Sequence, residues 1–513
     1  MKFLQKRSFL IFWLILSAIY ALIFIGVEFS SSPVNGFKGL AALAAQWFIV
    51  SASSAMVIGL ISVNRWIFCI LFPILFTASA IAAYFKITMG LSLTPTLIEL
   101  TMVNDWSTWV TVISFPLVAA ALFTLILSVF IAWIRWSKVD NPAKPWIWAI
   151  LFAVGIMIPI DVVARFKAPV IARIPYSFFY SFSDWRENRK AVAENRTTYS
   201  NISASAPEDA PDVVFIIGES LRPDHLSING YHRTTTPMLE KDSAVVSFTR
   251  VTTDYLYTHV SVPHIMTRNI PGKEDAAYED QSFITLFRKA GFHTAWLSNQ
   301  DEVSTYAYFM HEGDTLVQCN SARSMYGYDK WTDTDLLPHL DNILSDPVKR
   351  KLTVMHTIGS HWWYPSHYPD SLAVFKPEVD SRIVSELTRE QMINSYDNTI
   401  LATDRFLTSV IKRLEQRNAV MIFISDHGEC LGENGNYLHA DDYPELHPVA
   451  CMVWTSDEFR RRYPEKAEAL KKNATRDFST SAMFHSVLDA ASISTPVLNP
   501  GLSVFHNPDF KKI

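Results

Sequence analysis

Residues that could bind a metal follow three separate apolar runs of the sequence. Glu219 comes directly after DVVFIIG, His361 lies just beyond KLTVM, and Asp426 and His427 come directly after AVMIFIS. Carboxylate oxygens and imidazole nitrogens are ligands that suit zinc in proteins. An Asp-His pair alone is more often part of a capped turn. Candidate ligands at the ends of three apolar runs, taken together, predict a metal site.

A hydroxyl nucleophile is expected near such a site, because three protein ligands leave zinc an open position for catalysis. The segment THVSVP, residues 258–263, carries the hydroxyls of Thr258 and Ser261, and their spacing does not rank one above the other. The stretch FISDHGECLGENGNYLH adds His439 and three glycines. Such glycines permit a tight backbone next to a ligand, although they are equally ordinary in loops.

Short strands that alternate with amphipathic helices are predicted from residue 212 onward. The strand-like runs are rich in β-branched and aromatic residues: DVVFIIG, TAWLSN, KLTVMHT, AVMIFIS and CMVWTS. Helical patterns lie between them, as in residues 283–290 and 390–416. This alternation predicts an α/β domain with a largely parallel central sheet sandwiched by helices. Ligands of such sheets bind at the carboxyl ends of the strands, which is where the candidate ligands fall.

The first third of the chain is apolar instead. Five stretches reach the length of about 20 residues that a membrane-spanning helix needs: 9–29, 40–63, 66–85, 109–136 and 146–163. The sequence is therefore divided into a transmembrane domain of five helices (1–164), an interfacial segment and linker (165–211) and a soluble catalytic domain (212–513). The connection 86–108 is too long for a tight turn.

Basic residues are unevenly distributed among the connections between these spans. One side carries most of them: Lys2, Lys6, Arg7, Arg65, Arg135, Lys138 and Lys144. The other side carries only Lys38 and Lys86. The positive-inside rule then predicts a cytoplasmic N-terminus, and an odd number of spans places the soluble domain outside. A cleaved signal peptide is the alternative for residues 1–21, but the apolar run continues past any cleavage site and four more spans follow.

Charge and cysteine content exclude two other classes of protein. The net charge is −5 and no long basic block occurs, so no nucleic-acid partner is expected. Cys69 lies in a predicted span, which leaves Cys319, Cys430 and Cys451 for the soluble domain. Three cysteines are too few for a dense disulfide framework, although one bridge with one spare thiol is possible.

The chain resembles the membrane-anchored phosphoethanolamine transferases of Gram-negative envelopes. The resemblance lies in five motifs in the order of that family: VVFIIGESLRPDHLSINGYHRTTTP, THVSVP, HTIGSH, SYDNTILATD and SDHGECLGENGNYLH. This family includes lipid A modifiers associated with polymyxin resistance and belongs to the alkaline phosphatase and sulfatase superfamily. With the five spans included, the resemblance covers nearly the whole chain.

The resemblance implies a role for each matching residue. Four residues would hold zinc: Glu219, Thr258, Asp426 and His427. Thr258, at the head of THVSVP, would also be the nucleophile. His361 and His439 match histidines that bind substrate phosphate or a second zinc ion.

The resemblance also implies a reaction and a location. Thr258 would take phosphoethanolamine from phosphatidylethanolamine, release diacylglycerol and pass the group to a lipopolysaccharide acceptor: lipid A phosphate, Kdo or a core sugar. Alternatives are a periplasmic glucan acceptor, phosphoglycerol transfer, ester hydrolysis and a non-catalytic zinc sensor. The protein would be a monomer in the Gram-negative inner membrane, with its catalytic domain in the periplasm.

Several positions depart from the family's pattern. Its members commonly hold the external domain together with disulfides, yet residues 254–257 and 299–311 contain no cysteine. Cys430 stands where Ser is frequent, Ser220 replaces the common Thr, and His259 replaces a small residue. The ligands and the nucleophile are retained, so these departures bear on the choice of acceptor rather than on the chemistry.

Overall fold

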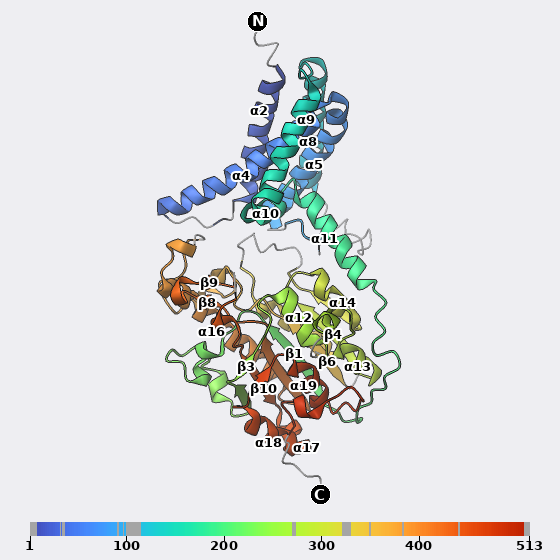
Figure 1. Cartoon of the computed structure of the whole chain (residues 1–513), viewed down its shortest axis with the longest axis vertical. Coiled ribbons are helices and arrows are strands. Elements are labelled where there is room, and N and C mark those ends of the chain that lie inside the picture. The colour runs from blue at the N-terminus through green and yellow to red at the C-terminus, as the bar shows by residue number, and fades with distance from the viewer. Residues whose placement is uncertain are drawn as a thin grey trace. The chain divides into compact units, whose positions relative to one another are not determined.

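This computed structural model describes most of the chain: residues 8–30, 32, 36–89, 92–95, 97–98, 114–268, 273–320, 330–347, 350–381, 384–439 and 442–506. Two compact units form, and the boundary between residues 186 and 187 falls within helix α11 (Ser177–Val192) (Figure 1). The domain boundaries predicted at residues 164 and 211 stay predictions. Much of the connection 86–108 lies outside the described residues.

The first unit contains five helices that are long and apolar enough to cross a membrane, as predicted. They span Ser8–Glu28, Gly36–Val63, Arg65–Thr88, Phe115–Ser137 and Pro145–Val162. In Figure 1 these are α2 (Ser8–Tyr20) with its continuation, α4 (Gly36–Val63), α5 (Arg65–Met89), α8 (Phe115–Ser137) and α9 (Pro145–Met157) with its continuation, followed by α10 (Ala164–Ile171). The fourth helix begins at Phe115 because Ser114 caps it: Ser114 Oγ accepts the Leu117 N–H at 3.4 Å.

A buried arginine joins two of these helices. The Arg135 side chain on α8 is fully buried, and its Nε and Nη2 donate to the carbonyl oxygen of Ser62 at 3.0 and 2.9 Å. Further bonds go to the Val139 carbonyl and to Asn141 Oδ1. The last carbonyls of a helix have no partner within that helix, so Arg135 satisfies the end of α4 where unpaired carbonyls would be costly.

A seven-stranded sheet forms the centre of the second unit, in the order β2-β10-β7-β1-β6-β4-β5. Its strands are β1 (Asp212–Gly218), β2 (Val245–Phe248), β4 (His293–Ser298), β5 (Thr315–Gln318), β6 (Lys351–His356), β7 (Ala419–Ser425) and β10 (Cys451–Thr455). All neighbours are parallel except β10, which runs antiparallel to β7 and β2. The predicted, largely parallel sheet is therefore confirmed. Two small sheets pair β3 (Val251–Thr252) with β11 (Phe478–Ser479) and β8 (Cys430–Leu431) with β9 (Tyr437–Leu438).

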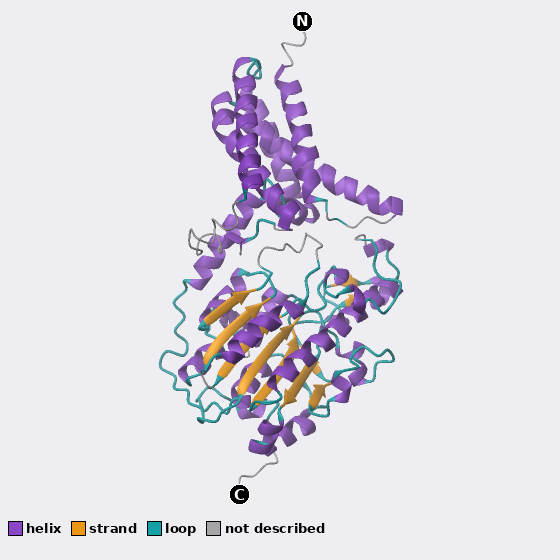
Figure 2. Ribbon diagram, turned by 180° about the vertical axis from the view of Figure 1, so that it is seen from behind, coloured by secondary structure: helices purple, strands orange, loops and turns teal. Residues whose placement is uncertain are grey.

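Helices cover both faces of this sheet (Figure 2). The helices of this unit are α12 (Thr258–Met266), α13 (Phe283–Lys289), α14 (Ser304–Glu312), α15 (Leu337–Ser345), α16 (Arg389–Leu414), α17 (Asp457–Arg462), α18 (Pro464–Asn473) and α19 (Ala482–Ala490). Alternate residues of β1, such as Phe215, join Phe283 of α13 and Phe484 of α19 in one buried core. A capping box of Thr388 and Gln391 starts the long helix α16.

All four cysteines of the chain are free, so the structure contains no disulfide. Burial raises the pKa of Cys430 and of Cys451 to about 12, so both thiols stay protonated near neutral pH. Cys430 therefore behaves as a small buried side chain opposite Leu438 in the β8–β9 pair.

Candidate active site

The carboxyl ends of neighbouring strands bring four of the predicted site residues together. β1 lies between β7 and β6 and is parallel to both. Glu219 follows β1 directly, while Asp426 and His427 follow β7. Thr258 is the first residue of α12. Residues far apart in the sequence thus meet at one edge of the sheet, because parallel neighbours end on the same side.

Glu219, Asp426 and His427 form a fully buried cluster of possible metal ligands. His427 Nε2 lies 3.4 Å from Glu219 Oε1 and 3.5 Å from Asp426 Oδ2. One ligand atom from each residue lies within 4.8 Å of the other two. Two carboxylates and an imidazole at this spacing are a donor set suited to zinc.

The remaining hydrogen-bonding capacity of this cluster fits a cation. Asp426 Oδ1 accepts the N–H groups of Ser220 and His427, at 3.1 and 2.8 Å. His427 Nδ1 bonds the Gly428 carbonyl oxygen at 2.8 Å, and a carbonyl only accepts, so the neutral form of this ring has its lone pair on Nε2. Asp426 Oδ2 and His427 Nε2 are buried and have no hydrogen-bond partner within the described part of the chain. Buried polar atoms are rarely left unpaired, so these two atoms fit a bound metal ion.

The Thr258 hydroxyl lies at the edge of this cluster. Its Oγ1 donates to Glu219 Oε2 at 2.9 Å, and the side chain is half-buried. Ser261 is fully buried, and its hydroxyl donates to the Asp426 carbonyl oxygen at 2.7 Å. The structure therefore separates the two hydroxyls that spacing could not rank: Thr258 can be reached by a substrate, whereas Ser261 is a structural anchor.

The two carboxylates differ in their electrostatics. Burial opposes ionisation of Glu219, but the charges of His427, His361 and His439 lower its pKa overall. Burial and the neighbouring charge of Glu219 raise the pKa of Asp426. Two buried carboxylates this close repel one another when both are ionised, which a divalent cation would relieve.

His439 and His361 lie beside the buried cluster rather than in it. The His439 ring centroid is 4.6 Å from that of His427, and its Nδ1 lies 3.3 Å from Glu429 Oε1. Burial opposes protonation of His439, but the hydrogen bond and charge of Glu429 raise its pKa to about 9. His361 Nδ1 bonds the Trp362 carbonyl oxygen, and its charge acts on Glu219.

Ser220 holds the two carboxylates in place. Its backbone has φ of 56°, a left-handed conformation that is uncommon outside glycine. In this conformation its N–H reaches Asp426 and its hydroxyl donates to Glu219 Oε1 at 2.8 Å. The Tyr396 hydroxyl donates to the Ser220 carbonyl oxygen at 2.7 Å and accepts the Arg222 N–H at 2.9 Å, which fixes the turn.

Sequence reasoning missed two further residues of the site. Gln300 Nε2 donates to Glu219 Oε2 at 2.9 Å and to the Thr357 carbonyl oxygen at 3.1 Å. Gln300 comes just after β4, so its place beyond a strand end could have revealed it. Glu429, which holds His439, lies three residues beyond Asp426, but the side chains that it contacts are not visible in the sequence.

A mostly parallel sheet that carries a hydroxyl and buried metal ligands at its carboxyl edge agrees with the resemblance to the alkaline phosphatase and sulfatase superfamily. A family model described as Sulfatase matches residues 211–493, more than half of the chain. The chain therefore belongs to the sulfatase family.

Its relatives within this family are named phosphoethanolamine transferases. Phosphoethanolamine transferase EptA of Escherichia coli is 31% identical over 300 residues, which cover 55% of this chain and 53% of the relative. A Kdo(2)-lipid A phosphoethanolamine 7''-transferase of Salmonella typhimurium is 32% identical over 263 residues, covering 50% and 46%. The chain thus spans about half the length of these relatives. Phosphoethanolamine transferase EptC of Escherichia coli is 24% identical over 551 residues, covering 98% and 92%.

Solved structures share the fold. The periplasmic domain of Escherichia coli EptC, in complex with Zn, is 25% identical with a TM-score of 0.54, and the match covers 61% of this chain and 90% of that domain. The integral membrane phosphoethanolamine transferase EptA of Neisseria meningitidis aligns with a TM-score of 0.55 at 23% identity, covering 96% and 97%. The second match extends the likeness in fold to the five apolar helices.

Proposed function

We propose that this protein is a zinc-dependent transferase that moves phosphoethanolamine from phosphatidylethanolamine to a lipopolysaccharide acceptor. The observation that carries the proposal is the Thr258 hydroxyl, which donates to Glu219 beside two buried, unpaired ligand atoms of Asp426 and His427. A nucleophile, a metal site and a membrane anchor are what transfer from a lipid requires.

Zinc would be held by Glu219, Thr258, Asp426 and His427, and when bound it would supply a Lewis acid that favours the alkoxide form of Thr258. The Thr258 oxygen then forms a bond to phosphorus as the bond from phosphorus to the diacylglycerol oxygen breaks. The proton from Thr258 ends on diacylglycerol. In the second step an acceptor oxygen bonds to phosphorus, the phospho-threonine bond breaks, and the acceptor's proton returns to Thr258.

His439 and His361 are the proposed groups on the substrate side. In the protein without metal the hydrogen bond and charge of Glu429 raise the pKa of His439 to about 9, which favours a positive charge on His439 near neutral pH. A cation beside the reacting phosphorus stabilises negative charge on its oxygens in the transition state. His361 would contact the same phosphate or assist proton transfer, and either histidine could instead contribute to a second zinc site.

The five apolar helices support a lipid substrate. We place the protein in the Gram-negative inner membrane, with a cytoplasmic N-terminus and a periplasmic catalytic domain from residue 212, working as a monomer. The uneven distribution of basic residues supports this orientation.

The names of the relatives support the proposed acceptor. Kdo(2)-lipid A is in the name of one relative, which favours lipid A phosphate, Kdo or a core sugar. A periplasmic glucan acceptor and phosphoglycerol transfer use the same residues and are the alternatives. A sulfatase usually needs a Cys or Ser that is converted to formylglycine, which Thr258 cannot supply. A non-catalytic zinc sensor is least favoured, because a sensor has no need of the nucleophile.

A comparison of two donor lipids tests the proposal. The purified, zinc-loaded protein is incubated with fluorescent phosphatidylethanolamine or fluorescent phosphatidylglycerol, and released diacylglycerol is measured. We expect release from phosphatidylethanolamine, and loss of that release when a chelator removes zinc. Release from phosphatidylglycerol alone would replace this proposal by phosphoglycerol transfer.

Mass spectrometry identifies the acceptor. Envelope lipids and glycans from cells with and without the gene are compared for the addition of one phosphoethanolamine group. Its appearance on lipid A or core sugars supports the proposed acceptor, and its appearance on a soluble glucan moves the assignment to the alternative.

A further inference from the structure

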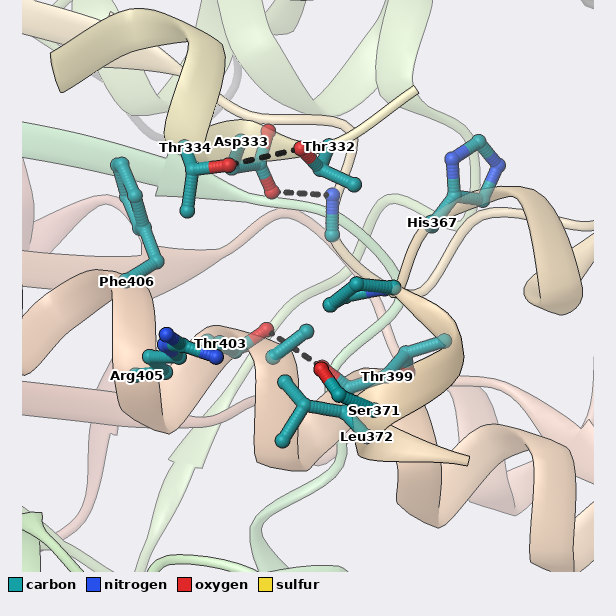
Figure 3. A pocket seen from close by; sticks show the side chains of 13 residues that line it. Thr332, Asp333, Thr334, His367, Ser371, Leu372, Thr399, Thr403, Arg405 and Phe406 are labelled. Carbon is teal, nitrogen blue, oxygen red and sulfur yellow. Dashed lines mark hydrogen bonds between the residues drawn. The ribbon is translucent and has the colours of Figure 1, made fainter. Parts of the chain in front are cut away.

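A cavity of about 370 Å³ lies in the second unit, outside the metal cluster. It is partly open, and it is lined by the N-terminal end of the 3-10 turn Asp333–Leu336, the turn after β6, the loop around Ser371, and one face of α16 (Figure 3). Its volume is at the lower end of the range for small-molecule sites, which is about 300–1,000 Å³. None of the chemistry proposed above uses this cavity.

The cavity exists because one face of α16 carries small and hydroxylated side chains. Thr399, Ala402, Thr403 and Phe406 all line it, and their spacing of three and four residues places them on the same face of the helix. A helix face that packs against a protein interior is usually filled by large apolar side chains. The small Ala402 and the two threonines leave space, which Phe406 bounds on one side.

The cavity is lined by hydroxyl groups with apolar side chains between them. Hydroxyl groups come from Thr332, Thr334, Ser371, Thr399 and Thr403. Thr332 and Thr334 bond one another at 2.8 Å, and Thr399 and Thr403 donate to carbonyl oxygens of α16 at 2.7 and 3.1 Å. These four hydroxyls therefore offer a ligand mainly acceptor lone pairs, whereas the Ser371 hydroxyl can donate as well. Pro369, Leu372 and Phe406 add apolar surface between them. A saccharide ring matches this pattern, because it presents hydroxyl groups around its edge and C–H groups on its faces.

One cation stands at the rim. Arg405 is exposed, lines the cavity, and makes no side-chain hydrogen bond or ion pair with any residue that the structure describes. The hydroxyl of Ser371 is likewise without a partner among the described residues. Asp333 also lines the cavity, so a small free anion would meet a carboxylate as well as the guanidinium. A saccharide with one anionic substituent avoids this repulsion, because the charged substituent can lie at Arg405 while the uncharged ring lies near Asp333.

The cavity shares a wall with the candidate active site. Asp333 accepts the N–H groups of Ile358 and Gly359 at 2.8 and 3.0 Å. Gly359 lines the cavity, and a Cβ atom added to it would lie 3.0 Å from the Glu219 carbonyl oxygen. Thr399 Oγ1 lies 2.7 Å from Ser360 Oγ in the same turn. A single turn of backbone therefore separates the cavity from Glu219.

We infer that this cavity binds a saccharide that carries a phosphate or carboxylate group, with the ring against α16 and the charge at Arg405. The ligand is either a sugar of the acceptor or a separate saccharide. Binding of this saccharide does not require the donor lipid. The inference can therefore be tested separately from the proposed transferase function.

Calorimetric titration of the full-length, zinc-loaded protein in detergent tests the inference, with glucose 1-phosphate as the probe. Glucose and inorganic phosphate are titrated in parallel. We expect glucose 1-phosphate to bind more tightly than either, because only this probe offers both the ring and the charge. Equal binding of inorganic phosphate would show a simple anion site and overturn the inference.

Two variants assign the binding to this cavity. Ala402→Phe fills the space and should abolish the saccharide-dependent binding, while Arg405→Ala should weaken binding of glucose 1-phosphate about tenfold and leave glucose unaffected. Lys412→Ala removes an exposed cation of the same helix that does not line the cavity, so it should bind like the wild type. Arg405 is exposed, so its variant decides the matter even if Ala402→Phe fails to fold. Wild-type affinity in Arg405→Ala, or a loss as large in Lys412→Ala, would refute the assignment.

Transfer kinetics distinguish the two sources of the ligand. If the cavity holds a sugar of the acceptor, glucose 1-phosphate should raise the KM for the acceptor in the wild type but not in Arg405→Ala. If it holds a separate saccharide, the probe should change kcat without competing with the acceptor. An absence of transfer activity would contradict the proposed function and would leave the calorimetric result in force.

Discussion

Thr258 and Glu219 are joined by a hydrogen bond of 2.9 Å between the hydroxyl of the first and Oε2 of the second. The bond connects the start of α12 to the end of β1. Ser261, one turn further along α12, bonds the carbonyl oxygen of Asp426. The helix is thereby held against two strand ends, and the hydroxyl of Thr258 keeps a constant position relative to the metal cluster.

Replacement of the nucleophile should separate catalysis from metal binding. Thr258→Ala should lower diacylglycerol release by about 1,000-fold or more, because the attacking oxygen is lost. Zinc content, measured by mass spectrometry, should stay close to one ion per chain at saturating zinc, since three ligands remain. Thr258→Ser keeps the oxygen and should retain part of the activity. Full activity in Thr258→Ala would show that another group attacks phosphorus.

Replacement of a ligand should instead reduce metal affinity. Asp426→Asn removes the charge from the buried Oδ2 atom that has no partner in the described structure. We expect zinc affinity, measured by competition with a chelator, to fall at least about tenfold. Asp370→Asn removes an exposed carboxylate and should bind zinc like the wild type. Unchanged affinity in Asp426→Asn would mean that zinc binds elsewhere.

The pH dependence of activity should report on His439. Its pKa of about 9 is raised largely by Glu429, so its positive charge is present at lower pH and is lost as pH rises through about 9. Glu429→Gln removes that charge and should lower the pKa of His439. The alkaline limb of the kcat/KM profile should therefore move to lower pH, while the acid limb stays. An alkaline limb that does not move would exclude His439 as the group responsible.

His356 should make the protein sensitive to acid. It is fully buried, both ring nitrogens lack partners in the described structure, and burial lowers its pKa to about 4. The unfolded chain takes up a proton near pH 6.5, so the neutral folded form loses stability as pH falls from about 6.5 towards 4. Between pH 7 and pH 5 this loss is about 2 kcal/mol.

His356→Phe should remove that loss. The melting temperatures of the variant and the wild type, measured at pH 7 and at pH 5, should differ more at pH 5, with the variant the more stable. An equal difference at both pH values would show that His356 does not titrate in this range.

Gly428 should not tolerate a side chain. A Cβ atom there would lie 2.3 Å from the Glu445 carbonyl oxygen and 3.0 Å from that of Pro448. Gly428→Ala should therefore cost about 1–3 kcal/mol of stability, measured by thermal unfolding. In Gly501→Ala the nearest atom is Asn499 Oδ1 at 3.4 Å, so that variant should unfold like the wild type. Equal stability of both variants would contradict the packing around Gly428.

Much of the fold could be predicted from the chain itself. All five apolar runs from residue 212 onward are strands of the central sheet, and the five apolar stretches near the N-terminus are helices. The strands β2 and β5 were not predicted, because each is a four-residue strand at an edge of the sheet. The order of the strands in the sheet could not be predicted either. β1 pairs with β6 and β7, and nothing in the sequence indicates that these strands are its neighbours.

The candidate site was predictable only in part. Glu219, Asp426 and His427 could be predicted, because each comes at the end of an apolar run that the sequence itself predicts to be a strand. The bonds of Ser220 and Gln300 could not, since they depend on a left-handed backbone and on a neighbouring strand. Spacing alone did not rank Thr258 above Ser261; the family resemblance did, and the burial of Ser261, which only the fold determines, gives the physical reason.

The three free cysteines of the soluble part, Cys319, Cys430 and Cys451, bear on how that part of the protein matures. Without a cross-link to form, its folding needs no thiol oxidant and no disulfide isomerase, and reductants should not weaken it. The compact sheet and its helices must then supply all the stability that covalent bridges would otherwise share. A cell that lacks oxidative folding machinery could therefore still produce the active form.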